Sequence, residues 1–221
     1  GVVPILHECS VEVEKGELAV IVGPNGAGKS TVMRVLLGML DATSGSVTLD
    51  GKDISMLSTQ DRISLGLAFV PQTKNVFPSM SVEENLQMGG FIRQDDINET
   101  IEEVYALFPI LYDKRKQLAE QLSGGQRQQV AFGRAMMTKP SIMLLDEPTA
   151  GVSPIVMDEI FSNILDVRDA GMAVLMVEQN AQQALNIADK GYVLVSGRNE
   201  HTGTGKELIN NPEVRKKFLG G

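Results

Sequence analysis

Cysteine and histidine are almost absent from the sequence. A single cysteine, Cys9, stands among 221 residues, which excludes a disulfide framework and a cysteine-based zinc cluster. We expect Cys9 to be a small buried residue, and such sparse use of cysteine is typical of a reducing compartment. His7 and His201 are isolated, so we expect both to be surface or packing residues rather than ligands.

An excess of positive charge is also lacking. Lysine and arginine number 20 against 28 aspartate and glutamate residues, which gives a net charge of −8. A protein that binds nucleic acid regardless of its sequence needs a basic surface to displace counterions. We therefore expect no nucleic-acid partner.

Long apolar runs are missing as well. The runs at 18–22 and 172–177 are far shorter than the roughly 18 residues of a membrane-spanning helix. No basic segment followed by a hydrophobic stretch marks a secretory signal, and without an initiator methionine we expect the chain to begin inside a longer gene product. These features favour a cytosolic protein, or one attached to a membrane only through a partner.

The residues that are present predict one α/β domain. The length suits one large domain, and short apolar runs alternate with helical stretches, which predicts a mostly parallel sheet. The predicted strands are 18–22, 46–49, 67–70, 141–145, 172–177 and 192–195. Helices are predicted over 30–40, 155–169 and 181–188, in a helical insert over 82–118, and from 206 onward. Gly197, Gly203 and Gly205 predict turns.

The clearest motif is a glycine-rich loop between a predicted strand and a predicted helix. Residues 23–30 read Gly-Pro-Asn-Gly-Ala-Gly-Lys-Ser, which matches the phosphate-binding loop and not the dinucleotide fingerprint. Its glycines let backbone N–H groups converge on phosphate oxygens. Lys29 would reach the β- and γ-phosphates, and Ser30 would offer its hydroxyl to Mg²⁺. The predicted nucleotide-binding residues are Gly23, Pro24, Asn25, Gly26, Ala27, Gly28, Lys29, Ser30 and Thr31.

Two adjacent carboxylates follow another predicted strand. Asp146 and Glu147 come directly after 141–145, so they should lie at the carboxyl edge of the sheet beside the phosphate loop. We expect Asp146 to hold Mg²⁺, directly or through water. Glu147 points differently and would polarise the attacking water.

A second glycine motif begins a predicted helix that runs to about Met137. Residues 122–126 read Leu-Ser-Gly-Gly-Gln, where Ser123 suits an N-cap and Gln126 completes a capping box. Two consecutive glycines cost about 1 kcal/mol each relative to alanine. The approach of bare backbone N–H groups to an anion would explain that cost.

Together the three motifs strongly resemble the ATP-binding cassette (ABC) ATPases over essentially the whole chain. The resemblance implies an α/β fold with a phosphate-loop NTPase core, an antiparallel β portion on the N-terminal side and an inserted helical subdomain. It assigns 1–81 and 119–221 to the core, and 82–118 with the start of the following helix to the helical subdomain. It also implies ATP hydrolysis with Mg²⁺ as cofactor.

The resemblance further implies a head-to-tail dimer with a second ABC ATPase subunit, either a copy or a paralogue. The residues that would cover the γ-phosphate bound by the other subunit are Ser123, Gly124, Gly125 and Gln126. Gln72 would sense Mg²⁺ and water in a loop that couples to a transmembrane permease subunit. The implied metal ligands are Ser30, Gln72 and Asp146, and the implied catalytic residues are Glu147, Gln72 and Gln179.

Three features depart from the family pattern. Gln179 stands where the family usually has histidine; an amide can bond the γ-phosphate but cannot carry a proton. Ser153 replaces the aspartate that usually ends the dimer-contact loop. The aromatic residue that stacks on adenine precedes the first strand in the family, and we expect it upstream of Gly1.

These departures resemble one subfamily. Val-Glu-Gln-Asn-Ala at 177–181, the segment 81–86 and the ending 218–221 resemble one ATPase of the branched-chain amino-acid importers. Such a chain lies at the cytoplasmic face of the inner membrane and works indirectly with a solute-binding protein. Importers of urea or short amides share these features. The alternatives are a lipopolysaccharide-export ATPase, a soluble DNA-repair or ribosome-associated cassette, and a helicase-like phosphate-loop enzyme, against which 122–126 argues.

Overall fold

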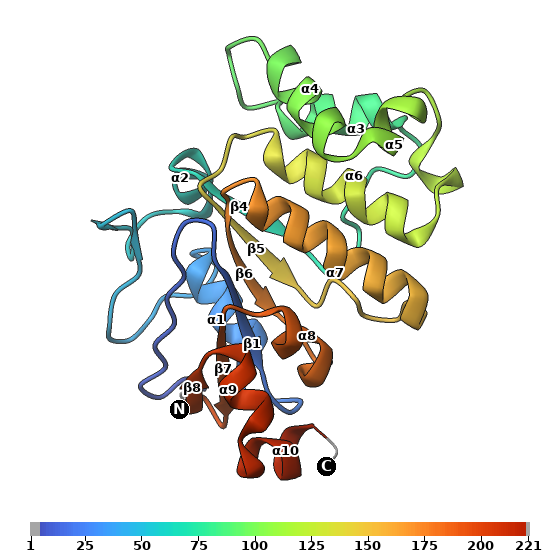
Figure 1. Cartoon of the computed structure of the whole chain (residues 1–221). Coiled ribbons are helices and arrows are strands. Elements are labelled where there is room, and N and C mark those ends of the chain that lie inside the picture. Colours follow the sequence, from blue (N-terminus) through green and yellow to red (C-terminus); the bar gives the residue numbers. More distant parts are fainter. Residues whose placement is uncertain (1–4, 220–221) are drawn as a thin grey trace.

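A computed structural model describes residues 5–219, and its centre is a six-stranded mixed sheet (Figure 1). In spatial order the strands are β4 (Leu67–Val70), β5 (Ile142–Asp146), β6 (Ala173–Val177), β1 (Leu18–Val22), β7 (Lys190–Val195) and β8 (Arg198–Gly203). Neighbouring strands from β4 to β7 pair in parallel, and β8 pairs antiparallel with β7. The parallel strands therefore bring their carboxyl ends to one edge of the sheet.

Strand β1 separates two hydrophobic cores. All five of its residues are buried, because β6 and β7 pair with its two sides and helices cover both faces. Leu18, Val20 and Val22 belong to the larger core, whereas Ala19 and Ile21 belong to the smaller one. This alternation follows from the period of two along a strand.

Ten α-helices in residues 5–219 surround the sheet or stand beside it. Those flanking the sheet are α1 (Lys29–Leu36), α2 (Thr59–Ser64), α7 (Pro154–Asp169), α8 (Ala181–Ile187), α9 (Gly205–Asn210) and α10 (Pro212–Phe218). The others are α3 (Val82–Gly89), α4 (Asn98–Leu107), α5 (Pro109–Asp113) and α6 (Gly124–Met136). Figure 1 shows α3, α4 and α5 gathered with α6 at one end of the molecule. None of the helices in the described part is long and apolar enough to cross a bilayer.

The predicted fold class is confirmed, with several local corrections. The antiparallel portion expected on the N-terminal side is a two-stranded hairpin of β2 (Thr48–Leu49) and β3 (Lys52–Asp53). Helix α1 ends at Leu36 rather than near 40, and α2 was not predicted. Gly197 lies in a turn between β7 and β8, as predicted, but Gly203 ends strand β8 and Gly205 begins helix α9. The C-terminal helix is divided at Pro212, which cannot donate a backbone hydrogen bond to a preceding turn. Cys9 is only partly buried, and this burial raises the pKa of its thiol.

Candidate functional site

The loop between β1 and α1 needs glycine for two structural reasons. A Cβ on Gly23 would lie 2.1 Å from the carbonyl oxygen of Leu194 in β7, so no side chain fits there. Gly28 precedes α1 with φ 106°, a left-handed conformation that non-glycine residues rarely adopt. The backbone thus turns sharply from a buried strand into the first turn of a helix, where N–H groups are available to an anion.

Lys29 folds back into this loop. Its side chain is almost fully buried, and Nζ donates to the carbonyl oxygens of Gly23 at 2.8 Å and Pro24 at 3.2 Å. Burial lowers the pKa of Lys29, while the charges of Glu147, Glu178 and Asp146 oppose that shift. Within residues 5–219 Lys29 forms no salt bridge. Its positive charge is therefore available to an anionic ligand in the loop.

Asp146 and Glu147 lie at the same edge of the sheet but differ in backbone conformation. Asp146 ends β5, and Glu147 takes a left-handed conformation with φ 46°, its N–H donating to the Val177 oxygen at 2.9 Å. Burial raises the pKa of both carboxyl groups; Lys29 opposes this in each case and Arg34 does so at Asp146. A carboxylate with a raised pKa is a stronger general base.

Gln72 approaches Glu147 from the neighbouring strand. It follows β4, which pairs with β5 in parallel register, and its Nε2 donates to Glu147 Oε2 at 3.4 Å. The structure therefore brings together Gln72, Asp146, Glu147 and Lys29, as the sequence predicted. Ser30 is exposed in the first turn of α1, directly after Lys29.

The predicted magnesium ligands fit that ion chemically. Ser30, Gln72 and Asp146 supply hydroxyl, amide and carboxylate oxygens, the hard donors that Mg²⁺ takes from proteins while retaining several waters. The raised pKa of Asp146 is also the kind of perturbation that a bound cation reverses.

The segment after β6 contributes an exposed residue and a buried one. Gln179 is exposed at the carboxyl end of β6. The preceding Glu178 is buried and was missed as a site residue, although a carboxylate directly after a buried strand is the same signal that identified Asp146. Its contacts are described below.

The Leu-Ser-Gly-Gly-Gln motif lies elsewhere in the chain. It begins α6 with the predicted capping box: Ser123 Oγ accepts from the Gln126 N–H, and Gln126 Oε1 accepts from the Ser123 N–H, both at 3.2 Å. Figure 1 shows the start of α6 well away from the loop between β1 and α1. Ser153 is the N-cap of α7 but makes no capping bond through its side chain.

Two further expectations fall outside the described residues. The adenine-stacking residue is expected upstream of Gly1, and Gly220 and Gly221 of the subfamily-like ending are beyond residue 219.

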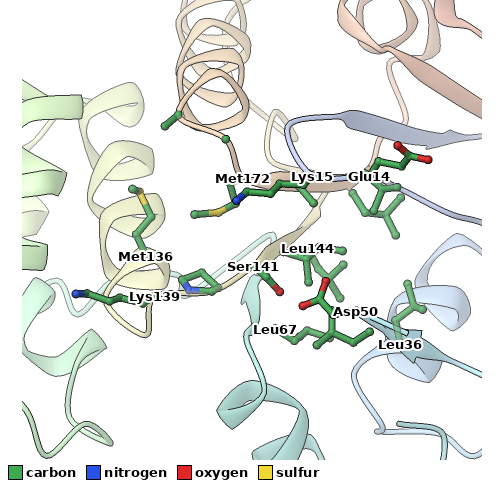
Figure 2. A pocket seen from close by; sticks show the side chains of 18 of the residues that line it. Glu14, Lys15, Leu36, Asp50, Leu67, Met136, Lys139, Ser141, Leu144 and Met172 are labelled. Carbon is green, nitrogen blue, oxygen red and sulfur yellow. The ribbon is translucent and has the colours of Figure 1, made fainter. Parts of the chain in front are cut away.

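A cavity of about 1310 Å³ lies at the opposite edge of the sheet. Figure 2 shows side chains from the starts of the strands lining it, with Leu67 from β4 and Ser141 and Met172 from the segments just before β5 and β6. No residue of the phosphate loop lines this cavity. It is therefore separate from the site described above.

Comparisons with known proteins agree with this geometry. The family model described as "ABC transporter" matches residues 6–150. The high-affinity branched-chain amino acid transport ATP-binding protein BraG of Pseudomonas aeruginosa is 45% identical over 100% of this chain and 95% of its own length. The lipopolysaccharide export system ATP-binding protein LptB of Haemophilus influenzae is 34% identical over 98% and 91%.

Solved structures give the same result. The crystal structure of the ADP conformation of an ATP-binding cassette of an ABC transporter superposes with a TM-score of 0.87 at 30% identity, over 98% of this chain and 93% of that one. The fold is that of the phosphate-loop NTPases, and the family match and the full-length similarity to BraG agree with it. The chain therefore belongs to the ABC transporter family as one of its ATP-binding cassettes.

Proposed function

We propose that this chain is the ATP-hydrolysing subunit of an ABC importer that energises the uptake of branched-chain and other hydrophobic amino acids. The observation that carries the proposal is the meeting of Lys29, Asp146 and Glu147 at one sheet edge, in a chain similar to BraG over its whole length. The identity to BraG exceeds that to LptB, 45% against 34%, which favours import over lipopolysaccharide export. Urea or short amides are the alternative cargo.

The site residues divide the work of hydrolysis. The loop 23–28 and Lys29 bind the phosphates of ATP through backbone N–H groups and one positive charge. Glu147 accepts a proton from the attacking water, and Gln72, bonded to Glu147, orients that carboxylate. Mg²⁺, held by Ser30, Gln72 and Asp146, would neutralise negative charge on the phosphates. Gln179 would bond the γ-phosphate without titrating.

The second half of the site comes from another ABC ATPase subunit. The start of α6 consists of the N-cap Ser123 followed by Gly124, Gly125 and Gln126. Figure 1 shows this end of α6 apart from the loop between β1 and α1, so it is available to a nucleotide held by a partner. A Cβ on Gly124 would meet only Val156, at an ordinary 3.5 Å. No contact within the described part of the chain requires glycine at that position, which supports the approach of a ligand from outside.

The helical subdomain, 82–118 with the start of α6, would dock the permease subunits at the cytoplasmic face of the inner membrane. Large apolar side chains are exposed here, at Met88, Phe91 and Ile92. Asn85 connects this region to the loop after Gln72, because it accepts from the Phe77 N–H at 2.7 Å and donates to the Phe77 oxygen at 3.0 Å. A permease that binds this surface would therefore be linked through Asn85 to the loop that begins at Gln72 in the ATP site.

The test is Glu147→Gln, which keeps the shape of the side chain and removes the base. Loss of a general base typically lowers the rate by about 10² to 10⁴, so we expect hydrolysis of MgATP to fall by that factor while ATP binding persists and favours the dimer in sizing experiments. Lys29→Ala should lose hydrolysis together with binding. Glu102→Gln, an exposed acid-to-amide change in α4, is the matched control.

Two results would contradict the proposal. Normal hydrolysis by Glu147→Gln would show that Glu147 is not the general base. Normal hydrolysis by Lys29→Ala would show that the loop 23–30 does not bind the phosphates of ATP. The cargo is tested with the assembled importer in vesicles, by comparing ATP-dependent uptake of leucine and urea. Uptake of urea alone would replace the amino-acid assignment.

A further inference from the structure

Glu178 is a buried carboxylate that has no role in the hydrolysis of ATP as proposed above. It follows β6 and is only 2% exposed, and its N–H donates to the Ile21 oxygen of β1 at 3.1 Å. The residue therefore lies between the strand that leads to the phosphate loop and the segment that carries Gln179.

The two carboxylate oxygens of Glu178 serve two different loops. Oε1 accepts from the N–H of Thr149 at 3.0 Å and from its hydroxyl at 2.6 Å. Oε2 accepts from the N–H groups of Gln179 at 2.9 Å and Asn180 at 3.3 Å. One side chain thus connects the loop after Glu147 with the segment after β6.

The geometry of these contacts favours a carboxylate over its amide. Burial of a charge is costly unless hydrogen bonds replace water, and within residues 5–219 Glu178 forms no salt bridge. Three of its four partners are backbone N–H groups, which cannot accept, and the Thr149 hydroxyl can donate as well. Glutamine would turn its NH₂ group toward a backbone N–H of one of the two loops, and two donors cannot bond each other.

The hydrogen bonds of Glu178 connect the segments that carry Glu147 and Gln179, the proposed base and γ-phosphate contact. Thr149 is two residues from Glu147, in a turn that the Ala150 N–H closes on the Glu147 oxygen at 3.1 Å. We propose that Glu178 is a positioning residue that holds the Glu147 loop and the Gln179 segment in register with each other. This inference rests on the proposed roles of Glu147 and Gln179. It means that the base and the γ-phosphate contact keep one mutual geometry.

The test is Glu178→Gln in the assembled importer. A misplacement of about 1 Å can cost 10²-fold in rate, so we expect kcat to fall by about 10- to 100-fold while KM for ATP stays within about threefold. Thr149→Val removes one bond to Oε1 and should lower kcat by about three- to tenfold. Because both changes break the same link, the double variant should hydrolyse ATP about as fast as Glu178→Gln alone.

Tyr192→Phe is the control. Tyr192 is buried in β7, where its hydroxyl donates to the Glu12 oxygen and accepts from the Glu12 N–H, each at 2.9 Å. Neither residue belongs to the proposed site or to the helical subdomain that would dock the permease. We expect this change to lower the unfolding midpoint as Thr149→Val does, with kcat per ATP-binding subunit unchanged. If Glu178→Gln does not fold, the comparison of Thr149→Val with Tyr192→Phe decides between a positioning role and a general loss of stability.

The outcomes separate this inference from the proposed function. If Glu147→Gln is inactive but Glu178→Gln and Thr149→Val keep kcat within twofold, the positioning role alone is overturned. It is also overturned if the loss of activity in each of these two variants is fully explained by a smaller fraction of subunits that bind ATP. If Glu147→Gln hydrolyses normally, the proposed function fails and this inference fails with it.

Discussion

Gly23 and Gly26 belong to one loop but have different surroundings, so the same substitution tests two effects. In Gly23→Ala the new Cβ would lie 2.1 Å from the oxygen and 3.1 Å from the carbon of the Leu194 carbonyl, at a φ of 153°. Real Cβ atoms do not approach backbone oxygen so closely, and β1 and β7 would have to separate by about 1 Å. In Gly26→Ala no atom of residues 5–219 lies within 4 Å of the new Cβ, and a φ of 79° opposes the change.

The expected costs follow from this difference. Overpacking costs about 1 to 3 kcal/mol and an unfavourable backbone conformation about 1 to 3 kcal/mol, so Gly23→Ala should lose about 4 kcal/mol of the free energy of unfolding. Gly26→Ala carries only the left-handed conformation, about 1 kcal/mol. In a domain of this size 1 kcal/mol shifts Tm by about 2 to 4 °C. We expect Tm to fall by about 8 to 16 °C for Gly23→Ala and by about 2 to 4 °C for Gly26→Ala.

The assay is urea unfolding followed by circular dichroism, together with thermal melts, on the two variants and the unchanged chain. An unaltered m-value would show that the shifts in midpoint report stability alone. Equal losses in the two variants, or a larger loss in Gly26→Ala, would refute the close packing of Leu194 against Gly23. The glycine of the phosphate loop would then be needed for conformation only.

Tyr105→Phe removes a buried hydroxyl that has no hydrogen-bond partner in the described residues, and it should leave stability at pH 7 unchanged or raise it by up to about 1 kcal/mol. Burial, together with the charge of Glu83, raises the pKa of Tyr105 to about 12; its contribution to stability is full below about pH 10 and is lost as pH rises from 10 towards 12. Urea unfolding at pH 8 and pH 11 should therefore show the unchanged chain losing stability relative to Tyr105→Phe, and parallel losses would contradict this. Gly124→Ala should stabilise the isolated chain by up to about 1 kcal/mol with ATP binding unchanged, yet reduce hydrolysis by the assembled importer, which normal hydrolysis would contradict.

The sequence predicts buried strands well and exposed ones poorly. Strands β1 and β4 have the predicted bounds, because a run of apolar residues is what burial on both faces selects. Strand β8 consists of Arg-Asn-Glu-His-Thr-Gly and alternates between exposed and half-buried positions at the sheet edge. No apolar pattern could identify it, because pairing with β7 creates this strand. Helix α2 has only six residues, too few for a helical period to be visible.

The site shows the same division between local and long-range information. The positions of Asp146 and Glu147 follow from one rule, that parallel strands deliver their last residues to a common edge. The hydrogen bond from Gln72 to Glu147 depends on which strand lies beside β5. The order of strands in a sheet cannot be predicted from the sequence of any one segment. Glu178 carried the same strand-end signal as Asp146, but the two loops that it connects become neighbours only in the folded chain.

The two glycine motifs differ in whether the chain itself explains them. Gly23 is fixed by its own fold, since Leu194 leaves no room for a side chain. Gly125 is covered by the Glu159 carboxylate, 2.3 Å from the place of its Cβ, but that side chain is flexible and can move. Gly124 has no such neighbour, although alanine would favour the helix that begins there. Glycine at 124 costs stability, and no contact among residues 5–219 requires it. The best explanation is that another molecule must approach this surface. This is the position at which the proposed function brings the nucleotide of a second subunit.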